Sequence, residues 1–406
     1  MNEITKGVVA PIGFKANGIH AGIRHNKDKI DLALIVSEKI CSAAAMYTSN
    51  KVKGAPIYVT EENLKDGKAQ AIICNSGNAN TCNKDGIEVA NKTCEILASN
   101  LGINKKDIIV GSTGVIGLPM SIDPFVTGIP EIIKGLDDKL ENSKLASKGI
   151  MTTDTVIKDC AVKFKIGGKT CKIGAITKGS GMNAPNMATM LCFITTDCNI
   201  TSEMLKKALK ESVEDSFNML SVDGDTSTND TVAIMANGMA ENELIDKPNR
   251  DFKTFLKALN YVCTNLAMKM AKDGEGASKL VICKVVGAKN KKQAKIVAKS
   301  VINSSLFKSA MFGADANWGR VLCAIGYANI DVDVLKVDMS FNSKKGEVIT
   351  CKSGYGVEFS EEIAKEVLLE DEITVLINLN SGKGEASAFG CDLTYDYVKI
   401  NGDYRS

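Results

Sequence analysis

Short apolar runs alternate with longer amphipathic stretches along the whole chain, and this alternation limits the folds open to it. The runs are rich in β-branched residues and predict strands at Ile30–Val36, Ala69–Cys74, Thr231–Ala236, Lys279–Val286, Asp331–Val337 and Glu372–Leu379. The amphipathic stretches repeat apolar residues every three to four positions and predict helices at Lys84–Leu101, Ser202–Leu220, Asp251–Lys272, Lys291–Val301 and Ser360–Leu369. Such a mixture predicts a layered α/β or α+β architecture.

The length of the chain sets its domain organisation. Its 406 residues correspond to roughly two to four domains at about 100–200 residues each. A lysine-rich run at 288–292 suggests a boundary loop near residue 285. Within the first part, Thr201 is the expected N-cap of the helix that starts at Ser202, because a threonine hydroxyl can accept a hydrogen bond from the first helical turn.

The charge balance excludes several classes of partner. Lys and Arg number 50 and Asp and Glu 48, so the net charge is only +2, and the chain has one Trp and 5% aromatic residues. The chain therefore lacks the strongly positive charge and the exposed aromatic side chains that nucleic-acid binding requires.

No segment reaches the roughly 18 apolar residues of a membrane span, and the first residues do not resemble a signal peptide. We expect a cytoplasmic protein that binds neither nucleic acid nor membrane.

Cysteine and histidine usage excludes several kinds of site. The chain has 13 cysteines with no CxxC pair, and only two histidines. This pattern fits buried reduced thiols better than a disulfide framework or a zinc site. With two histidines, the chain also offers few candidates for a catalytic triad based on histidine. We expect no metal and no bound cofactor.

Three polar loops are candidates for chemistry. In a phosphate loop the second glycine is followed by Lys and then by Ser or Thr. In Gly174–Gly181, Ser180 directly follows Gly179 and Lys178 precedes it, so this segment does not match a phosphate loop. Asp223–Asp230 lacks the glycine and the glutamate of a calcium loop, so we expect a turn or a polar wall of a site. Gly111–Gly117 is either a β-turn or a backbone that presents N–H groups to an oxyanion.

The most unusual segment is KGSGMNAPNMATMLCFITTD at 178–197, where a flexible stretch runs into an apolar strand. A threonine there is usually only a strand residue. However, the Thr189 hydroxyl can attack the carbonyl of Ala188, and hydrolysis of the resulting ester leaves a chain that starts at Thr189. The new α-amino group, with a pKa of roughly 8, can then act as base for the hydroxyl of the same residue. This route needs neither histidine nor metal.

The string KGSGMNAPNMATML resembles the self-cleaving signature of the ornithine acetyltransferase (ArgJ) family. Six further blocks resemble that family in the same order: CNSGNAN (74–80), GSTGVIG (111–117), TTDT (152–155), DGEGASK (273–279), ANWGR (316–320) and CDLTYDYVKINGDYRS (391–406). The resemblance therefore covers essentially the whole chain. Two departures are Asn183, where the family usually has an apolar residue, and the terminal Ser406, which replaces a threonine.

The resemblance implies a set of site residues. Autocleavage would fall between Ala188 and Thr189, giving an α chain of residues 1–188 and a β chain of residues 189–406, with Thr189 as the nucleophile. Thr113 and Gly114 match the pair that stabilises the oxyanion. The positions that match the family's substrate-binding residues are Thr152, Lys178, Thr189, Glu275, Asn401 and Ser406.

The resemblance also implies a fold and an assembly. We expect a layered α+β fold, the four-layer α/β/β/α DmpA/ArgJ-like sandwich, over residues 1–284. A smaller C-terminal α+β domain at 285–406 would carry the tail that closes over the substrate. Two α and two β chains are expected to form a heterotetramer.

The implied activity is that of a glutamate N-acetyltransferase in arginine biosynthesis. Thr189 would take the acetyl group from N2-acetyl-L-ornithine and pass it to L-glutamate in a ping-pong reaction. Some family members also use acetyl-CoA as donor, which makes it an optional co-substrate here. Two alternatives stay open at this point: an aminopeptidase-like or amidase-like hydrolase on the same scaffold, and an uncleaved small-molecule-binding protein.

Overall fold

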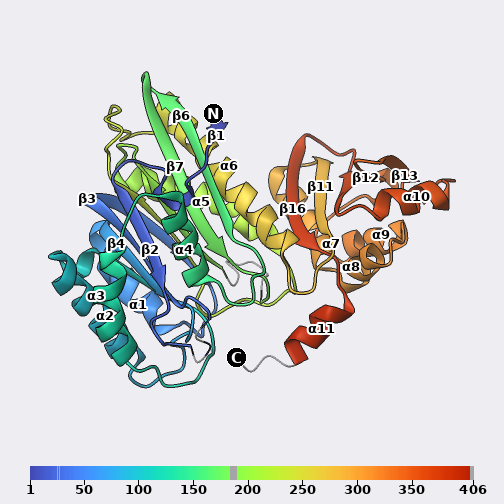
Figure 1. Ribbon diagram of the computed structural model, residues 1–406. Helices are drawn as coiled ribbons and strands as arrows, with labels where there is room; N and C mark the ends of the chain where they lie inside the picture. The colour runs from blue at the N-terminus through green and yellow to red at the C-terminus, as the bar shows by residue number, and fades with distance from the viewer. Residues whose placement is uncertain (25, 27, 183–189, 403–406) are drawn as a thin grey trace.

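The computed structural model describes residues 1–24, 26, 28–182 and 190–402. Within these residues the strands form one nine-stranded and one seven-stranded sheet. Figure 1 shows the two sheets in separate lobes, with the C-terminal helix α11 (Tyr395–Gly402) extending from the second lobe back toward the first.

The nine-stranded sheet has the order β1-β6-β7-β8-β10-β3-β4-β5, with β2 paired to β3. Its strands are β1 (Asn2–Glu3), β2 (Phe14–Ile19), β3 (Leu32–Tyr47), β4 (Lys68–Asn75), β5 (Ile108–Ser112), β6 (Lys158–Ile166), β7 (Lys169–Lys178), β8 (Leu191–Thr196) and β10 (Thr231–Ala236). Leu191 pairs with both Lys178 and Thr231. The C-terminal end of β7 and the N-terminal ends of β8 and β10 therefore lie side by side at one end of the central strands.

Three hydrophobic cores lie on the faces of these strands, and they define two β layers between two helical layers. The helices are α1 (Ala55–Asn63), α2 (Gly86–Leu101), α3 (Asp123–Lys134), α4 (Leu140–Ile150), α5 (Ser202–Asp215) and α6 (Arg250–Lys272). In β8, Leu191 and Phe193 face a core shared with β3, β4 and α4, whereas Cys192 and Ile194 face the core beneath α5 and α6. A third core separates β3, β4 and β5 from α1, α2 and α3. The predicted four-layer α/β/β/α arrangement is thus confirmed.

The seven-stranded sheet has the order β14-β13-β12-β15-β11-β16-β9. Its strands are β9 (Leu220–Ser221), β11 (Leu280–Ala288), β12 (Asp338–Ser343), β13 (Gly346–Lys352), β14 (Tyr355–Gly356), β15 (Glu372–Asn378) and β16 (Gly384–Cys391). Its helices are α7 (Lys291–Asn303), α8 (Ser305–Phe312), α9 (Trp318–Gly326) and α10 (Glu361–Leu368). The proposed boundary near residue 285 lies inside β11, and β9 reaches this sheet from the earlier part of the chain.

One predicted strand is wrong. Residues 331–337 alternate apolar and polar side chains, but the structure has a 3-10 turn at Val334–Lys336. The Asp333 carboxylate accepts a hydrogen bond from the Leu335 N–H and caps this turn, so the strand begins only at Asp338. The local hydrogen bond outweighs the strand propensity of the alternating residues.

The cysteines are distributed as the composition predicted. All 13 are free, and 11 of them are buried. Only Cys82 and Cys323 are exposed. In the part of the chain that the structure describes, no helix combines the length and the apolar composition needed to cross a membrane.

Candidate active site

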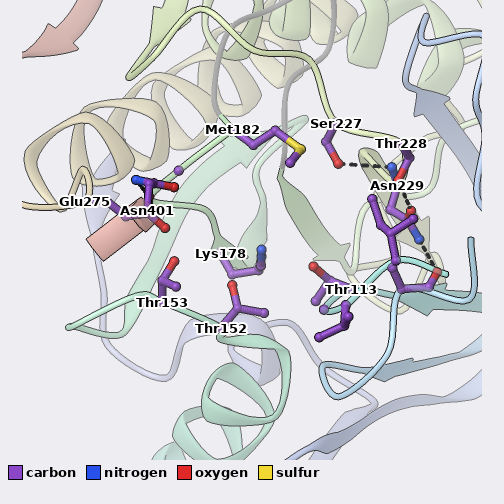
Figure 2. Close-up of a pocket in the computed structure, with 15 residues that line it drawn as sticks. Thr113, Thr152, Thr153, Lys178, Met182, Ser227, Thr228, Asn229, Glu275 and Asn401 are labelled. Atoms are coloured by element: carbon purple, nitrogen blue, oxygen red, sulfur yellow. Dashed lines mark hydrogen bonds between the residues drawn. The ribbon is translucent and has the colours of Figure 1, made fainter. Parts of the chain in front are cut away.

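A cavity of about 300 Å³ lies at the edge where β7, β8 and β10 meet, beside the C-terminal helix. Every predicted site residue that the structure describes lines it: Thr113, Gly114, Thr152, Lys178, Glu275 and Asn401. In Figure 2, Glu275 and Asn401 lie at one end, Thr113 lies toward the other end, and Lys178 lies between them. Segments far apart in the sequence thus meet in one pocket.

Three predicted residues, Ala188, Thr189 and Ser406, lie outside the described residues, as does the unusual Asn183. The described residues that flank the 183–189 segment are Met182 and Met190. Met182 lines the cavity. The chain therefore enters the segment that contains the predicted cleavage site from the wall of this pocket.

The predicted oxyanion pair follows β5. The Thr113 N–H donates to the Asn75 carbonyl at 2.9 Å, so the hydroxyl is the donor that Thr113 has left for a ligand. Gly114 has a φ of +127°, and a Cβ there would lie 2.8 Å from the Gly77 carbonyl carbon and 2.9 Å from the Asn78 nitrogen. Only glycine lets the backbone approach this closely. The Thr113 hydroxyl and the Gly114 N–H are thus the groups at this end that can receive developing negative charge.

A polar wall that the motifs did not identify as substrate-contacting comes from Ser227, Thr228 and Asn229. The Asn229 Nδ2 donates to the carbonyls of Ala79 at 2.6 Å and Ser112 at 2.9 Å. It therefore ties the segment before β10 to the loops after β4 and β5. The composition of 223–230 predicts a turn or a polar wall of a site. The position of this segment directly before the buried strand β10 is the sequence feature that indicates the wall.

Lys178 is the last residue of β7, and its side chain is buried. Among the described residues, no acceptor forms a hydrogen bond with its Nζ. Burial lowers the pKa of this ammonium, whereas the neighbouring Asp154 and Asp230 carboxylates act to raise it. A ligand carboxylate beside Nζ would supply a hydrogen-bonded anion and favour the charged form.

Glu275 and Asn401 form a pair at the other end of the pocket. The Asn401 Nδ2 donates to Glu275 Oε2 at 2.8 Å and to the Tyr397 carbonyl at 3.0 Å. The Glu275 N–H donates to the Ser180 carbonyl at 2.9 Å, which holds its backbone close to the end of β7. This end of the pocket is therefore anionic, while its middle carries the buried amine of Lys178.

Asp230 is a buried acid that the motifs also missed. Its Oδ1 accepts a hydrogen bond from the Met190 N–H at 2.7 Å. Burial raises the pKa of this carboxyl well above its ordinary value, although the Met190 N–H and Lys178 oppose the shift. The residue that follows position 189 is therefore anchored to the start of β10.

Sequence comparisons agree on one family. The model of the ArgJ family matches residues 15–406. "Arginine biosynthesis bifunctional protein ArgJ 1" of Clostridium acetobutylicum is 51% identical over 394 residues, which cover 97% of this chain and 96% of the relative. "Arginine biosynthesis bifunctional protein ArgJ" of Bacillus subtilis is 45% identical over 406 residues, which cover 100% of this chain and 98% of the relative.

Solved structures give matches to shorter chains. A crystal structure of the Bacillus halodurans bifunctional protein argJ is 46% identical with a TM-score of 0.50, and covers 52% of this chain and 98% of the solved chain. A structure of Mycobacterium tuberculosis ornithine acetyltransferase complexed with ornithine is 31% identical with a TM-score of 0.42, and covers 47% of this chain and 99% of the solved one.

Proposed function

The chain belongs to the ArgJ family, and from this premise we propose that it is a glutamate N-acetyltransferase of arginine biosynthesis. It would move the acetyl group of N2-acetyl-L-ornithine to L-glutamate. The observation that carries this proposal is the shared cavity, which joins six residues matching the family's site positions. The relatives are named as bifunctional proteins, which supports acetyl-CoA as a second acetyl donor. We propose no bound cofactor and no metal.

The proposed reaction has two half-reactions. The Thr189 hydroxyl attacks the acetyl carbonyl of N2-acetyl-L-ornithine, with the free α-amino group of Thr189 as base. The Thr113 hydroxyl and the Gly114 N–H hold the negatively charged oxygen, and ornithine leaves from an acetyl-enzyme. L-Glutamate then attacks the acetyl-enzyme and departs as N-acetyl-L-glutamate. One pocket that serves both amino acids in turn requires ping-pong kinetics.

The charges of the pocket suit the donor. In our proposal the α-carboxylate lies beside Lys178, and the ornithine ammonium lies beside Glu275. Thr152 and Asn401 line the same space, and Ser406 would close it from the end of the chain. Glutamate has the same α-carboxylate and therefore uses the same cation.

We also propose that the chain is cleaved between Ala188 and Thr189. A cut there leaves 188 and 218 of the 406 residues, about 46% and 54% of the chain. In support, the solved B. halodurans chain aligns over 98% of its own length with only 52% of this chain. The α2β2 assembly and the cytoplasmic location stay predictions from the sequence.

A hydrolase on the same scaffold is not favoured, because the relatives of this chain carry biosynthetic names. The two functions differ in the fate of the acetyl group. A hydrolase passes the group to water, so that glutamate would not change the product. A transferase yields N-acetyl-L-glutamate only when glutamate is present.

The decisive experiment is the intact mass of the denatured protein, with and without N2-acetyl-L-ornithine. We expect two fragments that break at Ala188/Thr189, with the larger one gaining one acetyl group from the donor. Thr189→Ala should leave one uncut chain of 43.3 kDa that never acetylates. Thr201→Ala, a threonine outside the pocket, is the control and should cleave and acetylate normally. Normal cleavage in Thr189→Ala would contradict the assignment.

A further inference from the structure

Behind the cavity, a buried ion cluster joins three of the segments that supply the pocket. Its members are Asp154, Lys158 and Asp273, none of which lines the cavity. The Lys158 Nζ lies 2.5 Å from both Asp154 Oδ1 and Asp273 Oδ2. The side chains of Lys158 and Asp154 are 0% exposed, and that of Asp273 is 8% exposed. One buried ammonium is therefore shared by a fully buried carboxylate and a slightly exposed one.

Asp154 fastens two segments of the pocket wall. Its Oδ2 accepts from the Thr152 N–H at 3.0 Å, and its Oδ1 accepts from the Gly179 N–H at 2.8 Å. Thr152 lines the cavity, and Gly179 directly follows Lys178. Burial opposes the ionisation of Asp154, but the Lys158 and Lys178 ammonium groups lower its pKa overall. The carboxylate therefore stays charged and keeps both hydrogen bonds.

Asp273 fastens the segment that carries Glu275. It is the first residue after α6 and lies two positions before Glu275. Its Oδ2 accepts from the Thr155 N–H at 3.0 Å, and its Oδ1 accepts from the Thr155 hydroxyl. The 152–155 loop is thus bound to the end of β7 through Asp154, and to the end of α6 through Asp273.

We infer that Lys158 is a positioning residue that sets the separation between the Lys178 amine and the Glu275 carboxylate, and so selects the length of the donor side chain. This inference rests on the proposed function, in which these two groups contact the two ends of the amino acid. The Lys158 ammonium links Asp154, which binds the Gly179 N–H next to Lys178, to Asp273, which lies two positions before Glu275. A rigid spacing lets a site distinguish ligands that differ by one methylene.

The test compares N2-acetyl-L-ornithine with N2-acetyl-L-lysine, which is one methylene longer. The measured quantity is the ratio of kcat/KM for the two donors. In Lys158→Met, which removes the charge at similar size, we expect this ratio to fall about tenfold or more. A merely structural role would lower the yield of folded protein or the rates with both donors, and would leave the ratio unchanged.

The matched control is Lys308→Met. Lys308 is also buried, at 4% exposed, and its Nζ donates to the Cys391 carbonyl at 2.6 Å, outside the pocket. Its replacement imposes the same kind of folding cost, and the donor ratio should stay within about twofold of wild type. A fall in this control equal to that in Lys158→Met would overturn the inference.

Asp273→Asn keeps the inference testable if Lys158→Met does not fold. The amide keeps an acceptor for Thr155 but removes the charge from one arm of the bridge, so an intermediate fall in the ratio is expected. An unchanged ratio in an active Asp273→Asn or Lys158→Met enzyme contradicts the inference alone. A wild-type enzyme that never acetylates from N2-acetyl-L-ornithine contradicts the proposed function instead.

Discussion

Burial raises the pKa of two acids beside the pocket, yet their net pKa shifts have opposite directions. Asp230 and Asp154 are both buried carboxyls, at the start of β10 and in the loop before β6. Burial raises the pKa of Asp230, and the nearby Lys178 does not reverse the shift. Asp154 has two close ammonium groups, and its pKa is lowered. The number of nearby cations therefore decides which of the two acids ionises readily.

This difference predicts how Asp230→Asn changes stability with pH. The folded state of the wild type keeps the Asp230 proton to higher pH than the unfolded state, so this group favours folding at low pH. Its contribution is lost as pH rises from about 4 through the raised folded pKa. The amide introduced by the substitution does not titrate, and its oxygen can still accept the Met190 N–H. We therefore expect Asp230→Asn to gain stability relative to wild type as pH rises, by about 1.4 kcal/mol per unit of pKa difference.

The measurement is the free energy of unfolding in urea at pH 5, 6.5 and 8, in a Thr189→Ala background so that every variant is one chain. Asp154→Asn is the matched control. The pKa of Asp154 is lowered in the folded state, so its carboxylate contributes stability above about pH 4. The decrease in the free energy of unfolding caused by Asp154→Asn should therefore be nearly constant from pH 5 to 8. A difference between Asp230→Asn and wild type that does not grow with pH would contradict the predicted shift.

Motifs identified some pocket residues and could not identify others. Gly114 and Lys178 lie in blocks whose letters alone resemble a family signature, so the sequence was enough to predict them. Lys158 carries no such signal, because its importance arises from Asp273, which lies 115 positions away in the chain. Asn229 likewise acts on backbone carbonyls of distant loops. Contacts between distant segments are not encoded in any local pattern.

At the scale of elements, local periodicity predicted the helix bounds to within about two residues, except at the C-terminal end of one helix. The helix expected over Ser202–Leu220 begins at Ser202 but ends at Asp215. Its apolar pattern continues into a 3-10 turn at Phe217–Met219 and then into β9, where Leu220 pairs with Phe389. The pairing partner comes from the other end of the chain. Tertiary contacts of this kind override helical periodicity.

The start of the same helix gives a prediction for Thr201. Its hydroxyl accepts from the Met204 N–H at 3.3 Å, which confirms the predicted N-cap. Thr201→Ala leaves this N–H without the cap and should lower the free energy of unfolding by about 1 kcal/mol. Thr201→Ser keeps the hydroxyl and should stay near wild type. Urea unfolding of the uncut Thr189→Ala protein measures both, and equal stabilities for the alanine and serine variants would contradict the cap.

At the scale of the whole molecule, the pocket belongs to the first lobe but is completed by the end of the chain. The strands of the second sheet end at Cys391, and α11 then returns toward the first lobe (Figure 1). The Thr394 hydroxyl donates to the Gly276 carbonyl at 2.6 Å and fixes the start of this return. Helix α11 buries none of its own residues, yet it brings Asn401 to Glu275. The helix therefore contributes to the site rather than to the core.

A truncation separates these two contributions. Removing residues 395–406 deletes α11 but no buried side chain of that helix, so the melting temperature should change by only about 2 °C. The same change removes the Asn401 hydrogen bond that orients the Glu275 carboxylate. In our proposal this carboxylate binds the ornithine ammonium, and a misplaced hydrogen bond between charged groups costs about 1.5–3 kcal/mol of binding. We therefore expect the KM for N2-acetyl-L-ornithine to rise about tenfold or more. Asn401→Ala should reproduce most of this rise, and removal of residues 403–406 alone isolates the part that depends on Ser406. A truncated protein that melts normally and keeps the wild-type KM would show that the pocket is complete without the chain end.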